Sequence, residues 1–459
     1  LGFVERTLAR AAPTELGIDL KVVDLLDDAA ERVKSVEDPG VQASLYHSLA
    51  RTQSALGRPR VAEALLREGL DQSKGRLDAL DAQRIQLQLL LVDVLLTLSE
   101  FAEIDARASE LAAALEVTRG RFDSQTLQVR TWAIRGLQET GQVEQALTRL
   151  EALIAEVEPA LGPGPDLATL LNTQARMLMR ARRDEASIAS FRREIAVRAA
   201  YGDADPRPVV NATGAPLMMA AARGRYDEVL VGLDAYEALI VERMGPDAPH
   251  LLNAHVMRMK ALWKQGQFEA AVALGRTAVP AAERRLGPRH PLVLNLSNQM
   301  AMAMGEGGEH AASLALLSAN RAVRAAVMGA GEPDVLLTMA QEAVQMAALG
   351  RHADALRLLA EARAGIRPDR IVEVWAAVPH ELDLAEARIL RVSGDLQQAL
   401  AKAGSALNGL TALYSDQDAL STDAARELTR ILERLGEVEE AAAIHARFPL
   451  LAQTPAPLP

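Results

Sequence analysis

The chain contains no cysteine among its 459 residues. Disulfide bonds and thiolate metal sites are therefore excluded, and the absence is compatible with either side of a bacterial membrane. Aromatic residues are also scarce, at 3%, although 49% of the residues are apolar. Most of that apolar content is alanine and leucine. This is the composition of closely packed helices, because alanine lets helices approach and loses no side-chain entropy.

Long apolar runs and a positive net charge are absent too. No run reaches the roughly 18 residues that can cross a bilayer, and the densest, 87–98, contains Gln88 and Asp93. The formal charge of -11 argues against non-specific nucleic-acid binding, which needs clustered lysine and arginine. Nothing near Leu1 resembles a signal peptide. Leu1 is not an initiator methionine, so we expect the chain to be part of a longer protein.

What the sequence does have is a repeat with a period of about 42 residues. A helix-breaking position, usually glycine, is followed five residues later by a small or apolar residue, usually alanine. The glycines are Gly57, Gly141, Gly224, Gly266, Gly308, Gly350, Gly394 and Gly436, and two weaker copies have Ser99 and Ala181 in that place. A fixed period in this range is typical of a solenoid, in which stacked units contact only their neighbours.

Residues 249–286 show how one repeat is built. Apolar residues recur at helical spacing from Leu252 to Trp263, and Gly266 follows, as glycine often does just after a helix. A second helix then begins near Phe268 and stops at Leu286-Gly287-Pro288. Similar closing phrases contain Gly162, Gly202, Gly245 and Gly329. Two sets of breaks that share one period predict a series of helix pairs.

The phrase LGPRHPLVLNLSNQMAMAMGEGGEHAASLALL resembles tetratricopeptide repeats of the 42-residue variety found in kinesin light chains. The residues that match in register are Leu286, Gly287, His290, Pro291, Val293, Asn298, Ala301 and Gly308. GQFEAAVAL and GRYDEVLVGL resemble the start of the second helix. The resemblance covers about 57–445. It implies an all-α fold, a right-handed superhelical solenoid of about ten antiparallel helix pairs, which we expect over 36–447.

The first 35 residues carry a second resemblance, in FVERTLARAAPTELGIDLKVVDLLDDAAERV. They are similar to the segment that precedes the repeats in bacterial membrane-bound serine/threonine kinases. The matching residues are Phe3, Pro13, Gly17, Val23, Leu25, Leu26, Asp27, Ala30 and Val33. The resemblance implies an upstream kinase domain and membrane span, with this chain on the periplasmic side; otherwise we expect a cytoplasmic protein. The alternative for 1–35 is an amphipathic helix that caps the solenoid.

Motifs for catalysis are missing. No glycine-rich loop follows a strand, no HRD-type or DFG motif occurs, and no HExxH or GxSxG is present. His250 and His255 are five residues apart, which is not the spacing that places two metal ligands on one helix face. We therefore expect no catalytic residue, no metal site and no cofactor in this chain.

The first helix of each pair in such a solenoid lines the concave face, where peptides dock. Counting back from each glycine, we expect groove-facing side chains about 13, 10, 9 and 6 residues before it. The candidates for peptide binding are Asn211, Asn253, Met257, Lys260, Asn295, Asn298, Gln299, Gln341, Arg135 and Arg388. In tetratricopeptide repeats that bind peptides, groove asparagines bond the peptide backbone, and the resemblance implies that role here.

Each part of that candidate groove has an alternative interpretation. The asparagines 13 residues before the glycine lie near a helix start, where asparagine can act as a cap. Five of nine residues at the position six before it are basic, namely Arg51, Arg135, Lys260, Arg388 and Arg430. They favour acidic or C-terminal-carboxylate peptides, or they pair with acids such as Glu381 and Asp423. Met218, Met257 and Met302 form an adaptable apolar patch or pack in the core.

The sequence therefore predicts a non-catalytic scaffold that binds a protein or peptide in its groove. We expect it to be the sensing or docking region of a bacterial serine/threonine kinase. The alternative is a sensing repeat region of a transcription regulator, or a stand-alone scaffold. The last segment, 448–459, contains Pro449, Pro455, Pro457 and Pro459, and we expect an extended or disordered tail there.

Overall fold

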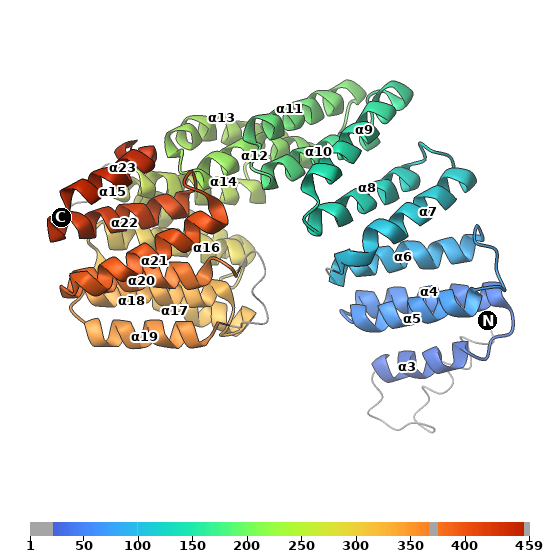
Figure 1. Cartoon of the computed structure of the whole chain (residues 1–459), viewed down its shortest axis with the longest axis horizontal. Helices are drawn as coiled ribbons and strands as arrows, with labels where there is room; N and C mark the ends of the chain where they lie inside the picture. Colours follow the sequence, from blue (N-terminus) through green and yellow to red (C-terminus); the bar gives the residue numbers. More distant parts are fainter. Residues whose placement is uncertain (1–21, 99, 367–374, 454–459) are drawn as a thin grey trace. The chain divides into compact units, whose positions relative to one another are not determined.

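The computed structural model describes residues 22–98, 100–366 and 375–453, and within them it contains 21 α-helices and no β-strand. The helices form two compact units, which we call unit 1 (residues 1–204) and unit 2 (residues 205–459) (Figure 1). The all-helical fold expected from the period is confirmed. Ser99 and the residues from Leu1 to Lys21 that carry part of the kinase-region resemblance lie outside the described residues.

The described part of unit 1 begins with a single helix, which four helix pairs follow. Its elements are α3 (Val22–Val33), α4 (Pro39–Ala55), α5 (Pro59–Ser73), α6 (Ala82–Leu98), η1 (Phe101–Glu103), α7 (Ile104–Thr118), α8 (Ser124–Glu139), α9 (Val143–Leu161), α10 (Pro165–Arg180) and α11 (Asp184–Tyr201). The two helices of each pair pack against one another, beginning with α4 on α5.

Unit 2 contains six helix pairs and a short last turn. Its elements are α12 (Pro206–Ala222), α13 (Tyr226–Met244), α14 (Pro249–Lys264), α15 (Phe268–Leu286), α16 (Pro291–Glu306), α17 (His310–Met328), α18 (Pro333–Ala348), α19 (His352–Ala364), α20 (Val378–Ser393), α21 (Leu396–Tyr414), α22 (Ala419–Leu435), α23 (Val438–Arg447) and η3 (Pro449–Gln453). Helices α4 to α23 thus make ten pairs, the number that the period predicts.

The repeating glycines and prolines mark the helix boundaries. Proline occupies the first turn of α14, α16 and α18, where its missing N–H would have no partner in the helix. Gly266 lies between α14 and α15 with a φ of 75°, a left-handed conformation that glycine adopts without strain. The glycines therefore recur because each turn requires that backbone conformation.

The weak repeat near residue 181 differs from the sequence interpretation by one residue. The left-handed position between α10 and α11 is Arg182, with a φ of 58°, and Ala181 is the C-cap residue that follows α10. Counting from Arg182 restores an interval of 42 residues to Gly224. The sequence pattern does not reveal the turn at Arg182, because the equivalent residue in most other repeats is a glycine.

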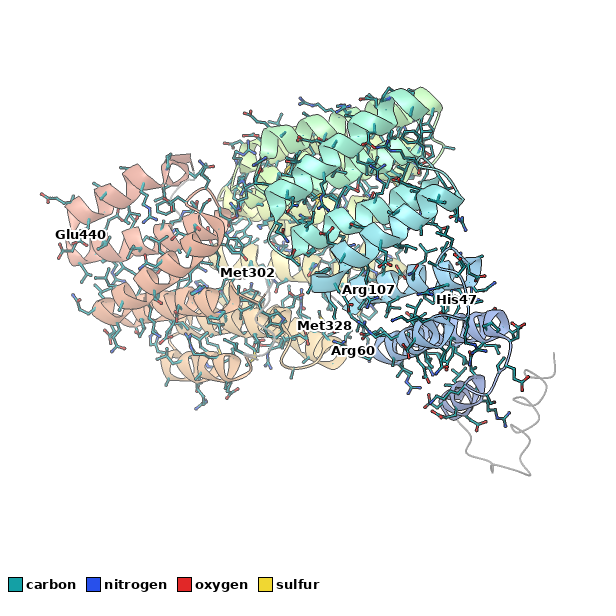
Figure 2. All side chains as sticks on the ribbon, turned by 45° about the vertical axis from the view of Figure 1, so that its right-hand side comes forward. His47, Arg60, Arg107, Met302, Met328 and Glu440 are labelled. Atoms are coloured by element: carbon teal, nitrogen blue, oxygen red, sulfur yellow. The ribbon has the colours of Figure 1, made fainter. Side chains whose placement is uncertain are left out.

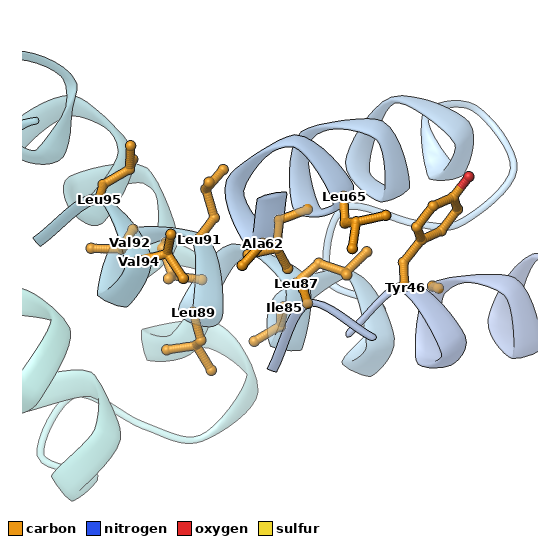
Figure 3. Packing of buried hydrophobic residues seen from close by; sticks show 14 of the residues in the cluster. Tyr46, Ala62, Leu65, Ile85, Leu87, Leu89, Leu91, Val92, Val94 and Leu95 are labelled. Atoms are coloured by element: carbon orange, nitrogen blue, oxygen red, sulfur yellow. The ribbon is translucent and has the colours of Figure 1, made fainter. Parts of the chain in front are cut away.

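The core of unit 1 is built from helix faces that pack across the pairs. Tyr46, Ala62, Leu65, Leu87 and Leu91 lie in one buried cluster (Figure 3). Helix α6 buries residues on nearly all its sides, which explains why its sequence is the densest apolar run. No helix among the described residues is long and apolar enough to cross a membrane.

The first helices of the pairs also pack on one another in unit 2. Helix α14 contacts α16, and α18 contacts α20, so the stacking of successive repeats runs through these helices. This arrangement gives the first helices one face toward their own second helix and another that we call the inner face. The inner face comprises the side chains about 13, 10, 9 and 6 residues before each turn glycine.

The two ends of the array are covered by short elements. Helix α3 buries Ala29 and Val33 against the first pair. At the other end, the structure differs from the predicted tail: η3 is a 3-10 helix, and Phe448 and Leu451 are buried with α22 and α23. Apolar contacts by these two residues stabilise a segment whose proline content had suggested disorder. Residues 454–459 lie outside the described part.

Candidate binding surface

The inner face of unit 2 brings together residues from repeats that are far apart in sequence. Lys260 on α14 is half-buried, and burial lowers the pKa of its ammonium group. The nearby Lys264 lowers that pKa further, while Asp423, Asp418 and Glu381 act in the opposite direction. Helices α14, α20 and α22 therefore present these side chains to one common region.

Asp423 is the most strongly held carboxylate of this surface. Lys264 Nζ donates to Asp423 Oδ2 at 2.5 Å, and Arg426 donates to Asp423 Oδ1 at 2.8 Å. Burial alone would raise the pKa of Asp423, but Lys264, Arg426 and Arg388 together hold it well below its usual range. Asp423 is therefore ionised and fully engaged.

Glu427 is a buried carboxylate with three arginine side chains near it. Its side chain is 1% exposed, and Arg391 donates a hydrogen bond to Oε1. The other oxygen, Oε2, accepts no hydrogen bond from the residues that the structure describes, although Arg430 and Arg388 lie 3.7 Å and 3.9 Å away. Three guanidinium groups thus face one carboxylate, and two of them retain unused donors.

Glu381 is the opposite case, a carboxyl group that burial favours in its neutral form. Burial raises the pKa of Glu381 to about 7, and Asp423 adds to the rise, whereas Lys260 and Arg388 reduce it. Lys260 forms no hydrogen bond or close ion pair with a described residue. A half-buried lysine and a titratable acid therefore share this surface without forming an ion pair.

Amide side chains continue the inner face along α16 and α18. The amide oxygens of Asn298, Gln299 and Gln341 are buried and accept no hydrogen bond from the described residues. Buried polar atoms nearly always have a partner, and Gln299 and Gln341 lie at the same place in their repeats, with Asn298 adjacent, so these oxygens suggest a missing donor. A bound peptide backbone could supply it through its N–H groups.

The structure places the remaining candidates differently. Asn211 and Asn253 are exposed, in the second turns of α12 and α14, whose N-cap residues are Asp205 and Ala248. Asn295 accepts a hydrogen bond at 2.7 Å from Arg324, which also binds Asp334. Asn295 therefore joins α16 to α17 and, through Arg324, to α18.

The methionine and arginine candidates also differ in their location and burial. Met257 packs against a core cluster, and Met302 is buried in another, whereas Met218 is 57% exposed. Arg135 lies on α8 in unit 1, where it is exposed and 3.8 Å from Glu139. Arg388 lies on the inner face of unit 2, 3.9 Å from Glu427 Oε2, and its charge also lowers the pKa of Glu381.

Sequence reasoning did not select Lys264, Glu381, Asp423 and Glu427 as site residues. Three of them were within reach of its own rule, because Glu381 and Asp423 lie 13 residues before Gly394 and Gly436, and Glu427 lies nine before Gly436. Extending the count to the last two repeats would have identified them. Lys264 follows no such rule, since it meets Asp423 only through the curvature of unit 2.

Comparisons with known proteins agree with the fold. No family model and no curated protein matches the sequence. The apo form of RapI has a TM-score of 0.55 at 9% identity, with 80% of this chain and 97% of RapI covered. The apo form of the quorum sensor NprR from B. thuringiensis has a TM-score of 0.46 at 11% identity, with 88% and 97% covered.

A crystal structure from Podosopora anserina, described as a kinesin light chain with nearly identical TPR-like repeats, has a TM-score of 0.38 at 21% identity. It covers 44% of this chain and 97% of its own. At these identities the likeness to RapI shows the fold alone. The chain is accordingly a tetratricopeptide-like helical repeat array.

Proposed function

We propose that this chain is a binding scaffold whose unit 2 holds an acidic segment of a partner protein on its inner face, without catalysis. The observation that carries the proposal is the group of half-buried cations Lys260, Arg388 and Arg430. None of the three has a carboxylate bound by a hydrogen bond among the described residues. Charge-assisted hydrogen bonds from such cations are stronger than those between neutral groups.

The unbonded amide oxygens support a peptide as the form of this ligand. Asn298 and Gln299 on α16 and Gln341 on α18 offer acceptors, and a peptide backbone carries a donor at nearly every residue. An acidic side chain or a terminal carboxylate would then reach Lys260 or Arg388. Asn211, Asn253 and Asn295 remain proposed contacts for the same peptide, with weaker support because two are exposed and one already binds Arg324.

Selection from a random peptide library followed by affinity measurement tests the proposal. We expect the selected peptides to be enriched in Asp and Glu. Changing Lys260 and Arg388 together to Ala should weaken their binding by about tenfold or more, as for truncation of central charged contacts. The exposed Arg289 of the same unit provides the control, because Arg289→Ala should leave binding within twofold or so. Equal binding by both variants would exclude the inner face.

We also propose that the scaffold acts as the sensing or docking part of a bacterial serine/threonine kinase. Its support is the sequence resemblance of 1–35, of whose matching residues Leu26, Ala30 and Val33 pack from α3 onto the core of unit 1. That packing equally suits a capping helix. The coding sequence upstream of Leu1 decides between them: a kinase domain followed by an apolar span supports the proposal, and a DNA-binding module supports a transcription regulator instead.

A further inference from the structure

The first two repeats of unit 2 meet its last repeat. The ion pair between Lys264 Nζ and Asp423 Oδ2, at 2.5 Å, joins α14 to α22 across 159 residues of sequence. Both side chains are only 12% exposed. Figure 1 shows α22, in red, beside the green and yellow helices with which unit 2 begins. The contact is therefore a closure of unit 2 upon itself.

A second point of contact lies at the turn between α12 and α13. A Cβ atom added to Gly224 would lie 3.6 Å from Leu450 Cδ1 and 3.9 Å from Ala419 Cβ. Tyr226, the next helix residue, is buried near Asp423, Arg426 and Asp418, and this burial raises the pKa of its hydroxyl. The closure thus involves α12, α13 and α14 on one side and α22 and η3 on the other.

The closure consists of a few contacts: the ion pair of Lys264 with Asp423, and the approach of Gly224 to Ala419 and Leu450. Among the described residues, the extended packing of α22 is with α21, α23, α20 and η3. An ion pair of this kind becomes weaker as water and salt reach it. In a repeat array, small rotations at successive repeats add up, so α14 and α22 can separate with little change within any one repeat.

We propose that this contact is a clasp that controls access to the inner face of unit 2. The proposal rests on the binding role proposed above, because it concerns the regulation of that site. Lys260 lies one helical turn from Lys264, and Asp423 occupies a position of the inner face itself. An acidic ligand that reaches Lys264 competes with Asp423 for the same ammonium group. Ligand binding therefore opens the clasp, and a closed clasp slows ligand entry.

The absence of native cysteine allows a direct test by disulfide trapping. The distance of 3.9 Å between the added Cβ of residue 224 and the Cβ of Ala419 lies in the range that a disulfide spans. We expect the double variant Gly224→Cys, Ala419→Cys to form this bond on mild oxidation, as measured by loss of free thiol. Adding Lys264→Ala should slow its formation by about threefold or more, because the clasp is then open more often.

A cysteine on the inner face reports on access without any ligand. In the variant Gln341→Cys, with no other cysteine present, we expect the rate of labelling by a bulky maleimide to rise at least about threefold when Lys264→Ala is added. Arg289→Ala in place of Lys264→Ala is the control and should leave the rate unchanged. An unchanged rate with Lys264→Ala, or failure of the 224–419 disulfide to form, would overturn the clasp. The labelling of Gln341→Cys does not involve residue 224, so it tests the clasp even if a cysteine at that left-handed position disturbs the turn.

Binding of a fluorescein-labelled octaglutamate peptide then separates the clasp from the proposed function. We expect the reduced double-cysteine variant to bind the peptide and the oxidised variant to bind it at least about fivefold more slowly. Equal association rates would contradict the clasp even if the disulfide forms. If the reduced form does not bind while Gln341→Cys still responds to Lys264→Ala, the clasp stands and the acidic ligand is wrong.

Discussion

The same position of the repeat has different surroundings in the two units. Six residues before the turn, unit 1 has Arg51, Asp93 and Arg135, and all three side chains are exposed. With the turn placed at Arg182, Arg176 joins them and is also exposed. In unit 2 the equivalent side chains, except that of Met218, are half-buried or buried; they are Lys260, Met302, Val344, Arg388 and Arg430. The difference does not follow from the repeat itself, because the helices are built alike.

The cause is that the ion pairs of unit 1 join neighbouring repeats, whereas unit 2 also has an ion pair between distant repeats. In unit 1, ion pairs such as Arg149 with Asp105 and Arg180 with Glu139 join one repeat to the next. In unit 2, Lys264 reaches Asp423 on the last pair, so the two ends of the unit shield each other. Contact between distant repeats therefore makes an otherwise solvated face of a solenoid into a site where charges interact strongly.

The acidic residues of the units show the same contrast. Glu63, Glu100 and Glu103 bring carboxylate oxygens together in unit 1, close enough to suggest a metal site. Arg60, Arg67 and Arg107 bind these carboxylates, so the charges are balanced by protein groups (Arg60 and Arg107 are labelled in Figure 2). At Glu427 in unit 2, by contrast, three arginines share one carboxylate.

The largest expected effect comes from removing one carboxylate in each unit. Asp423→Asn removes the anion that Lys264 binds at a site only 12% exposed, and we expect unit 2 to lose about 2–4 kcal/mol. Asp105→Asn in unit 1 removes the half-buried partner of the exposed Arg149 and should cost below about 1 kcal/mol. Urea unfolding measures the loss in the free energy of unfolding for each variant. Hydrogen exchange of the amides of α22 and α7 assigns the loss to unit 2 or unit 1. Equal losses would show that the two units do not differ in the way their charges are buried.

A second comparison uses pH, because two carboxyl groups shift in opposite directions. The folded-state pKa of Glu381, about 7, lies above the ordinary value of 4.5. Between these values the Glu381 carboxyl group is ionised in the unfolded chain and protonated in the folded unit 2. The free energy of unfolding of unit 2 therefore falls as the pH rises toward 7. Glu381→Gln should remove that loss and stabilise unit 2 at pH 8 by about 1–2 kcal/mol, with no gain at pH 4.

Glu103 in unit 1 provides the matched case of opposite sign. Hydrogen bonds from Arg67 and then Arg107 lower the pKa of Glu103, against the effect of burial. Its stabilising contribution is present above the ordinary pKa of 4.5 and is lost as pH falls below it. Glu103→Gln should therefore destabilise unit 1 at pH 8, by less than about 1 kcal/mol at this partly exposed site. The comparison fails if the two variants show the same dependence on pH.

The fold could be predicted from the sequence, but the contact between α14 and α22 could not. Each turn depends on local chemistry, such as the left-handed glycine at Gly266 and the proline that begins α14, so the period reveals ten pairs. The inner positions of Lys260 and Arg388 follow from the same count. The contact of Lys264 with Asp423 depends on small rotations added over several repeats, and no local pattern encodes their sum. The burial of Phe448 and Leu451 likewise depends on apolar surface that α22 and α23 provide.

The smallest effect concerns two turns, one in each unit, where a described residue other than glycine is left-handed. Arg182 in unit 1 has a φ of 58°, and Ser415 in unit 2 has a φ of 74° at the end of α21, where equivalent helices end in glycine. Such a conformation costs a residue with a Cβ roughly 1–2 kcal/mol, part of which is offset by the greater freedom of glycine in the unfolded chain.

We therefore expect Arg182→Gly and Ser415→Gly each to stabilise its own unit by about 0.5–1 kcal/mol, measured as a rise in thermal midpoint. Arg182→Ala and Ser415→Ala are the controls, since they remove the same side chains and keep the strain. The gain of glycine over alanine should be similar in both units, because it arises from the backbone of a single turn. A gain confined to unit 2 would mean that the closure, and not the local turn, determines how much strain each unit tolerates.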